Sequence, residues 1–210
     1  MRVTGWKAWS ITAGAIAGIA VFLSASAAPP RPQALQAAAQ ELVLSLDQSQ
    51  SKVNYMVDST LHTVHGTFNV KSGVLRIDPA TGKAGGEIIV YATSGDSGNS
   101  SRDEKMHKTV LESAKYNEIV FRPTQVDGKL AVSGPCDVKL HGVFSLHGGD
   151  HDLVVPVHIE ISGDHWKGTT KFEVPYIQWG LKDPSNFLLK VKPSVDIELE
   201  LAGSLKSSRP

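Results

Sequence analysis

Residues 195–201 read Val-Asp-Ile-Glu-Leu-Glu-Leu, a strict alternation of apolar and acidic side chains. Because successive side chains of a β-strand point to opposite faces, the pattern puts the four apolar side chains on one face and the three carboxylates on the other. A strand with one apolar and one charged face is typical of an antiparallel sheet that covers a core on one side and meets water on the other.

The same alternation recurs along the chain from Leu42 onward. Residues 52–58, for example, place Val53, Tyr55 and Val57 on one face. Turn residues such as Asp127-Gly128 and Gly148-Gly149 separate such segments and indicate hairpins. Further strands are predicted at 67–71, 85–93, 118–122, 129–133, 137–145, 153–162, 165–174, 187–192 and 195–201. The chain is therefore all-β, either a closed or nearly closed barrel or a sandwich, and the number of strands does not separate the two.

Residues 101–113 break this pattern, because Met106, Val110 and Leu111 have helical spacing. Ser101 is predicted as the N-cap, with Glu104 completing a capping box. We therefore expect one short helix between strands.

The N-terminal segment predicts export. Arg2 and Lys7 precede an apolar run that ends in Ala25-Ser-Ala27, a pattern that a signal peptidase accepts. We expect a signal peptide at 1–27, with an uncleaved membrane anchor as the alternative. A Pro-rich and Ala-rich linker follows at 28–41, then the domain at 42–204 and a tail at 205–210. The domain is accordingly expected in the periplasm or secreted.

Charge and cysteine content exclude several classes of protein. The 21 basic and 21 acidic residues balance, so the chain has no electrostatic footprint for nucleic acid. The single Cys136 forms no intrachain disulfide, and the chain is long enough to bury a core without one. The sequence does not decide whether the chain forms a homodimer.

Two motifs have a catalytic or metal-binding interpretation. Gly95-Asp-Ser-Gly98 matches the string around a serine-protease nucleophile, but it lies in a Gly/Ser-rich loop and lacks its structural context, so we interpret it as a turn and expect no enzymatic activity. His147, Asp150 and His151, with His141 one strand away, are the alternative metal ligands. Because loops collect polar residues, the favoured interpretation is a polar hairpin tip without metal.

Aromatic residues fall mostly on the predicted strands, either as ordinary core or as the wall of a ligand cavity. Periodicity does not distinguish a filled barrel from a hollow one. Near the helix start, Arg102, Asp103 and His107 have two interpretations of equal weight, helix capping or contact with a polar head group at a cavity mouth.

The order of several short motifs resembles the YceI-like family, bacterial lipocalin-like proteins associated with polyisoprenoid binding. The matching pieces span about residues 42–203: Val64-His-Gly-Thr-Phe68, Arg102-Asp103 with Met106-His107, Ala114-Lys-Tyr-Asn-Glu-Ile-Val-Phe121, Val132-Ser-Gly134 and Leu140-His-Gly-Val143. Departures from the family pattern, such as Asn117 in place of a proline, fall on loops.

This resemblance implies an extended antiparallel lipocalin-like β-barrel of about eight strands with one short helix inserted between strands. It also implies that the barrel interior holds a long isoprenoid, such as a quinone or polyprenyl phosphate, without other cofactors. The protein would then be a carrier or a stress-related protein. The membrane then serves only as a lipid source or as the site of an uncleaved N-terminus. The residues expected to line the cavity are Tyr55, Val57, Phe68, Ile89, Tyr91, Phe121 and Phe172. Those expected at its mouth are Arg102, Asp103 and His107.

Overall fold

The computed structural model of the chain describes residues 41–207. The predicted signal peptide and all but the last residue of the predicted linker lie outside this range and stay predictions. Among the described residues, no helix is both long and apolar enough to cross a bilayer.

Within 41–207 the chain forms one antiparallel sheet of ten strands with short helical segments between them. The strands are β1 (Leu42–Leu46), β2 (Lys52–Asp58), β3 (Thr63–Phe68), β4 (Val70–Ile77), β5 (Ala84–Tyr91), β6 (Glu118–Asp127), β7 (Gly134–Leu146), β8 (Gly149–Ser162), β9 (His165–Val174) and β10 (Val195–Ser207). The helical segments are η1 (Gln48–Gln50), η2 (Ala92–Ser94), α1 (Ser100–Lys105) and the π-helical turn η3 (Met106–Val110).

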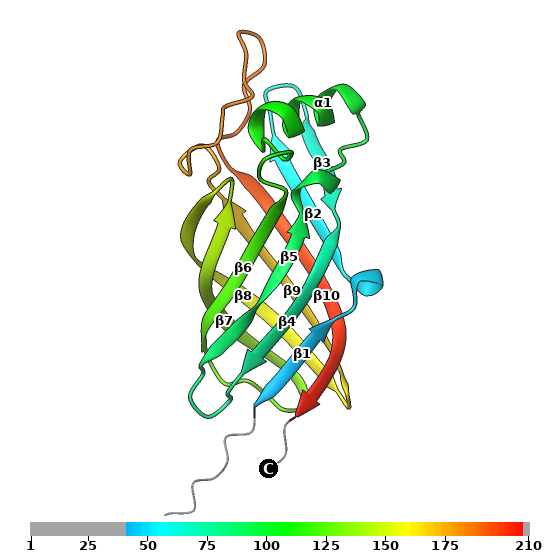
Figure 1. The fold of residues 1–210 in the computed structure, drawn as a ribbon, viewed down its shortest axis with the longest axis vertical. Helices are drawn as coiled ribbons and strands as arrows, with labels where there is room; N and C mark the ends of the chain where they lie inside the picture. Colours follow the sequence, from blue (N-terminus) through cyan, green and yellow to red (C-terminus); the bar gives the residue numbers. More distant parts are fainter. Residues whose placement is uncertain (1–40, 208–210) are drawn as a thin grey trace, which may run out of the picture. The chain divides into compact units, whose positions relative to one another are not determined.

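The sheet closes into a barrel, because β1 pairs with both β4 and β10. The closed ring runs β1-β4-β5-β6-β7-β8-β9-β10 and back to β1 (Figure 1). The expected eight-stranded antiparallel barrel with one short helix is confirmed. Within this ring of eight strands, closure removes the open edges that would otherwise expose unpaired backbone groups.

The β2–β3 hairpin lengthens this barrel at one end. β10 pairs with β1 through Gly203–Ser207 and with β2 through Asp196–Glu200, so β1 and β2 lie one after the other along the same edge of β10. β3 likewise pairs with β2 and β4 with β1. Each of these two positions in the barrel is therefore one long strand interrupted once, and α1 lies at the same end as the hairpin (Figure 1).

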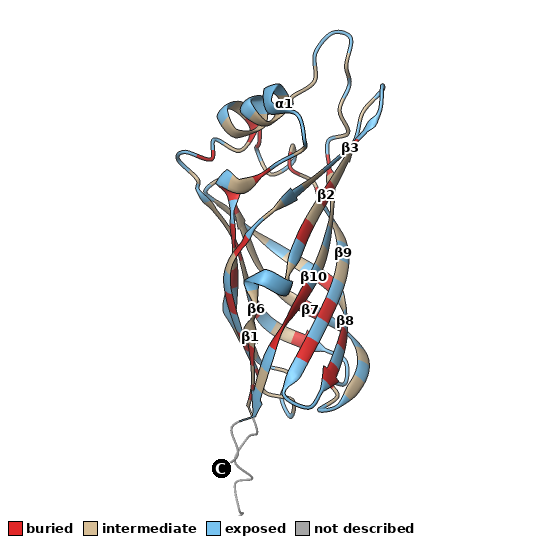
Figure 2. Cartoon of the chain, turned by 90° about the vertical axis from the view of Figure 1, so that its right-hand side faces the viewer, coloured by how far each residue is buried: buried red, intermediate tan, exposed pale blue. Residues whose placement is uncertain are grey.

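Alternation along the strands produces the core, as Figure 2 shows by its bands of buried residues. In β4, Val70, Gly73, Leu75 and Ile77 are buried or face the interior, while Val74 and Arg76 are exposed. The main core cluster draws on nearly every strand and includes Leu42, Leu44, Val138, Ile161 and Trp166. The predicted one-sided burial of an antiparallel sheet is therefore found.

Several predicted boundaries were wrong. Residues 129–133 and 187–192 are not strands but connections, whereas β1 was not predicted as a separate strand. The N-cap of α1 is Asn99, whose side-chain oxygen accepts from the Arg102 N–H, and not Ser101. Glu104 does not complete a capping box but pairs with Lys108 at 2.5 Å. β10 runs to Ser207, three residues past the predicted domain end at 204.

Candidate functional site

The barrel is hollow, and its interior holds two adjoining apolar cavities. The inner cavity, about 120 Å³, lies among residues of the closed barrel such as Leu75, Val126, Ile159 and Trp166. The upper cavity, about 340 Å³, is lined by residues of α1, the β2–β3 hairpin and neighbouring elements. Four side chains line both cavities: Phe68, Ile119, Phe144 and Ile197. Ligand pockets in proteins are commonly about 300–1,000 Å³ and mostly apolar, so the upper cavity is large enough for part of a lipid-sized molecule.

Tyr55 and Phe68 pack against each other in the wall of the upper cavity. Their ring centroids are 5.3 Å apart, and the Tyr55 hydroxyl lies 3.7 Å from the Met106 sulfur. Burial, followed by the nearby charge of Asp103, raises the pKa of Tyr55, so its phenol stays neutral. Gly66 lies under the ring: an added Cβ there would come within 2.3 Å of the Tyr55 ring carbons. The glycine of the sequence motif His65-Gly-Thr-Phe68 thus allows this aromatic packing.

Five of the seven side chains predicted to line the cavity do so. Tyr55, Val57 and Phe68 line the upper cavity, and Phe68, Phe121 and Phe172 line the inner one. Ile89 and Tyr91 do not, and their placement is corrected. Their neighbours Ile88 and Val90 face the core, so the alternation of β5 turns Ile89 and Tyr91 outward, and Tyr91 is 42% exposed.

Of the three residues predicted at the mouth, only Arg102 lines the cavity. Its Nε donates to the Ser97 hydroxyl at 2.7 Å and an outer nitrogen donates to the Ser97 carbonyl at 2.8 Å. The remaining outer nitrogen lies 3.5 Å from Nε2 of His62 on the β2–β3 hairpin. The guanidinium therefore carries a positive charge at the cavity wall, fixed by its loop partners.

Asp103 and His107 instead hold the loop that precedes α1. Asp103 accepts from both the backbone N–H and the hydroxyl of Ser97, at 3.0 and 2.5 Å. His107 Nε2 lies 2.9 Å from the Gly95 carbonyl, which only accepts, so Nε2 carries the proton. His107 Nδ1 lies 3.0 Å from the Ser113 hydroxyl. The contacts of Asp103 and His107 therefore support a structural role near the helix start rather than contact with a polar head group.

Replacing Asp103 by alanine is expected to lower the free energy of unfolding by about 1–3 kcal/mol, because the Ser97 N–H and hydroxyl lose a charged acceptor in a partly buried place. Glu104→Ala is the matched control on the same helix, since Glu104 bonds only the exposed Lys108, and it should change stability by less than about 1 kcal/mol. Urea unfolding of both variants measures the difference. Equal losses would mean that Asp103 is not anchoring this loop.

The Gly95-Asp-Ser-Gly98 string is a structural turn. Ser97 bonds Asp103 and Arg102, while the nearby His107 bonds the Gly95 carbonyl and not the Ser97 hydroxyl. The nucleophile-to-histidine contact of a serine hydrolase is therefore not formed. Gly95 itself packs tightly, since an added Cβ would lie 2.7 Å from both Met106 and Phe68.

The alternative metal ligands are separated. No group of three or more His, Cys, Asp or Glu side chains among residues 41–207 lies close enough to hold a metal ion. His147 bonds Glu112 at 2.6 Å, Asp150 accepts from Ser145 at 2.5 Å, and His151 stacks on Trp179 with centroids 4.1 Å apart. These contacts hold the β7–β8 hairpin against its neighbours, and the alternative ligand set is not assembled within residues 41–207.

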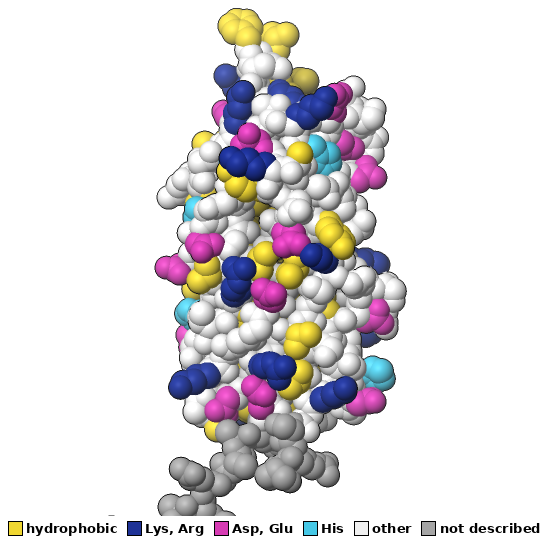
Figure 3. All heavy atoms as spheres, in the orientation of Figure 1, with side chains coloured by type: hydrophobic (Ala, Val, Ile, Leu, Met, Phe, Trp, Pro, Cys, Tyr) yellow, Lys and Arg dark blue, Asp and Glu magenta, His cyan; other side chains and the backbone are white. Residues whose placement is uncertain are grey.

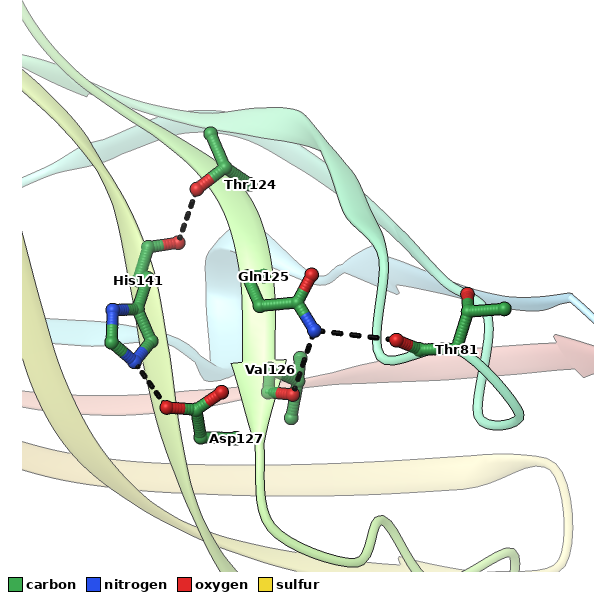
Figure 4. Close-up of polar contacts among 6 residues, drawn as sticks. All are labelled: Thr81, Thr124, Gln125, Val126, Asp127 and His141. Carbon is green, nitrogen blue, oxygen red and sulfur yellow. Dashed lines mark hydrogen bonds and ion pairs between the residues drawn. The ribbon is translucent and has the colours of Figure 1, made fainter.

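His141 belongs to a different cluster on the outer surface of β6 and β7. Figure 4 shows its Nε2 beside the Asp127 carboxylate, at 2.7 Å, while its carbonyl accepts from Thr124 at 3.3 Å. Gln125 reaches across to the Thr81 carbonyl on the β4–β5 connection at 3.3 Å. These contacts lie where the β6–β7 register shifts between Pro123 and Gln125, and they stabilise that irregularity.

Tyr176 lines the upper cavity, and its raised pKa leads us to expect that the free energy of unfolding falls at alkaline pH. Burial, followed by the charge of Asp183, raises its pKa from 10.0 to about 12, and its hydroxyl donates to the Lys192 carbonyl at 2.9 Å. The unfolded chain releases this proton near pH 10 and the folded chain only near pH 12, so the stabilisation is complete below about pH 10 and is lost between these values. Tyr176→Phe should therefore lose less stability than the parent between about pH 9 and about pH 11. Urea midpoints at both pH values, with Tyr91→Phe on the outer face as control, test this; equal slopes would contradict it.

Sequence reasoning missed the part of the cavity wall that comes from the β9–β10 connection. Leu181, Leu189 and Val191 of this connection line the upper cavity. The alternation of 187–192 was the available signal, but it was interpreted as a strand. Trp166 was also missed: it lines the inner cavity, and its indole N–H is buried without a partner in the described part of the chain.

The model of the YceI-like domain matches residues 44–202. No curated protein matches the chain by sequence.

Solved structures share the fold at low sequence identity. BcnA of Burkholderia cenocepacia superimposes with a TM-score of 0.63 at 15% identity, over 75% of this chain and 99% of BcnA. A polyisoprenoid binding domain from Saccharophagus degradans, implicated in plant cell wall breakdown, has a TM-score of 0.58 at 16% identity, over 80% and 98% of the two chains. A Campylobacter jejuni YceI protein has a TM-score of 0.54 at 15% identity, over 65% and 83%.

Proposed function

This chain belongs to the YceI-like family, and from that premise we propose that it is a binding protein that holds a long-chain isoprenoid or a similar lipid in the interior of its barrel. The observation that carries the proposal is the pair of adjoining cavities, whose shared wall consists of Phe68, Ile119, Phe144 and Ile197. The polyisoprenoid binding domain of Saccharophagus degradans, with the same fold, supports this class of ligand.

The physical basis of affinity is burial of the hydrocarbon chain. Each CH₂ group removed from water contributes about 0.8 kcal/mol, so a prenyl tail in an apolar cavity binds without charged contacts. The narrow inner cavity suits the end of a chain, while the wider upper cavity, with Arg102 in its wall, suits the end that carries a polar group. The Trp166 indole N–H is a free donor at the inner end for a ligand that carries an acceptor there.

The proposal includes a carrier role outside the cytoplasm, without catalysis. Support for export is the signal-peptide pattern of residues 1–27. Support for binding without chemistry is that the best catalytic string, Gly95–Gly98, is used for loop contacts. Arg102 offers a positive charge to a phosphate or a hydrogen bond to a quinone oxygen.

Organic extraction of the purified protein followed by mass spectrometry tests the proposal. The full chain is produced in a bacterial host with intact membranes, and we expect an isoprenoid lipid in the extract at close to one molecule per protein. A protein that contains no lipid, and that also fails to bind added geranylgeraniol, overturns the proposal. Ester-hydrolysing activity that disappears in Ser97→Ala would overturn its non-catalytic part.

A further inference from the structure

Large apolar side chains are exposed at the end of the barrel where the upper cavity lies. Phe187 and Leu188 are 96% and 81% exposed at the tip of the β9–β10 connection, and Leu61 is 73% exposed at the tip of the β2–β3 hairpin. Both segments stand at the same end as α1 (Figure 1). Figure 3 shows hydrophobic atoms at the extremity of this end, with Lys and Arg side chains below them.

The loop that carries Phe187 and Leu188 is held in place by its own contacts. The Asn186 side-chain oxygen accepts from the backbone N–H groups of Leu188 and Leu189, at 2.9 and 2.8 Å. At the base of the loop, Thr60 donates to the Lys190 carbonyl at 2.9 Å, so the loop is bound to the β2–β3 hairpin. The two exposed side chains are therefore presented by a defined turn.

Basic side chains surround this apolar tip. Lys182 and Lys190 flank it along the chain, and Lys105 reaches the loop by donating to the Pro184 carbonyl at 2.7 Å. Arg102 adds a further positive charge at the cavity wall. Lys192 is neutralised by Glu173 and Asp196, at 3.2 and 3.7 Å, and Lys108 by Glu104. Asp183 is the only acid between residues 181 and 194 of the loop, which leaves the tip with a positive balance.

The upper cavity opens between these same elements. Its wall includes His62 of the hairpin, Lys105 of α1, and Pro184 and Leu189 of the loop, of which His62 and Lys105 are exposed. A ligand that leaves the cavity at this end passes the exposed apolar tip.

We propose that this end of the barrel binds the surface of an anionic lipid bilayer, with Leu61, Phe187 and Leu188 inserted among the lipids and Lys105, Lys182 and Lys190 at the level of the head groups. We call these six residues the docking end. Exposed apolar patches mark interaction sites, and basic residues close to an anionic leaflet add electrostatic attraction. The inference rests on the proposed function for its purpose, because docking here places the cavity opening against the source or destination of the lipid.

Local fluorescence tests the insertion directly. An environment-sensitive nitrobenzoxadiazole label is attached to Leu188→Cys in the full chain, with Cys136→Ser removing the native thiol. The control carries the label at Val132→Cys, which is 60% exposed in the β6–β7 connection at the opposite end of the barrel. With phosphatidylcholine vesicles that contain phosphatidylglycerol, we expect a blue shift and a rise in intensity for the label at 188 only. The fluorescence of each label reports the surroundings of that position alone.

Binding of vesicles by variants of the apolar tip, each labelled at Leu61→Cys, is the second measurement. Phe187→Ser combined with Leu188→Ser should weaken the response of a label placed at Leu61→Cys at least ten-fold, whereas Val132→Ser with Val154→Ser should leave it unchanged. All four of these side chains are exposed, so both pairs should keep the parent's thermal stability. Raising the salt concentration to about 1 M should weaken the response, because the charges on the lysines are then screened within a few Å.

If the fluorescence of the label at position 188 does not change when anionic vesicles are added, the proposed docking end is wrong. A dimer, detected by sedimentation, that disappears in the Phe187→Ser, Leu188→Ser variant also overturns it, because a second copy would then be the occupant of this surface. Neither result tests lipid binding in the cavity, which is measured separately with geranylgeraniol in the absence of vesicles. A docking variant that binds geranylgeraniol like the parent, but takes it up from vesicles at least ten-fold more slowly, supports both proposals.

Discussion

Replacing Gly203 by alanine is expected to lower the free energy of unfolding by at least about 3 kcal/mol, because the new side chain collides with the backbone that closes the barrel. Gly203 lies on β10 between its two neighbours, opposite Leu46 of β1 and Trp166 of β9. An added Cβ would lie 1.9 Å from the Ser45 carbonyl oxygen and 3.0 Å from the Leu46 Cα. These are backbone atoms, so no side-chain rotation relieves the collision, and β1 must move away from β10.

Urea unfolding of Gly203→Ala measures this loss. The matched control is Gly85→Ala on β5, where an added Cβ has no atom within 4 Å. We expect the control to remain within about 0.5 kcal/mol of the parent, because alanine there adds no contact and restricts the unfolded chain. If both variants unfold at the parent's urea midpoint, the β1–β10 closure does not have the close geometry described above.

Val57→Trp is expected to weaken the binding of geranylgeraniol at least ten-fold, which corresponds to about 1.4 kcal/mol. Val57 lies on β2 and lines the upper cavity, so an indole at this position occupies the space that the ligand requires. Substituting a side chain that lines the hollow region fills existing space, which limits the damage to folding.

Met56→Trp is the matched control for this variant. Met56 precedes Val57 on β2, so its side chain points to the other face of the sheet, and it lines neither cavity. Binding is measured by fluorescence titration or calorimetry with geranylgeraniol. An equal loss of affinity in both variants, or no loss in Val57→Trp, would contradict a ligand in the upper cavity, provided that both variants unfold at temperatures close to that of the parent.

The cavity wall was predictable where one face of a strand is apolar and the other polar. Tyr55 and Val57 alternate with Asn54 and Asp58, so the side facing the interior follows from the sequence. In β5, Ile88, Ile89, Val90 and Tyr91 are apolar or aromatic on both faces, and the prediction chose the wrong pair. The interior face of β5 is decided by its pairing with β4 and β6, which periodicity does not contain.

The connection at 182–194 is a second place where the periodicity of the sequence does not determine which side chains face the cavity. Alternation of apolar residues in 187–192 predicted a strand, but Pro184 and Pro193 flank the segment, and the Asn186 side chain caps its backbone in a turn. Leu189 and Val191 turn into the cavity while Phe187 and Leu188 remain exposed. That division depends on the hairpin at Thr60, which is distant in sequence.

For this protein, the sequence alone determined the all-β class, most strands of the sheet, the short helix between them and the resemblance to the YceI-like family, because alternation and turn residues are local properties of the chain. The tertiary structure decided the closure of β1 on β10, which joins residues 42–46 to 203–207. It also decided the hollow interior, the assignment of Asp103 and His107 to loop contacts, and the gathering of exposed apolar residues at one end. Each of these features depends on which distant segments meet and on how completely their side chains fill the space between them. A period of two residues in the sequence encodes neither the meeting of the segments nor the filling of the space.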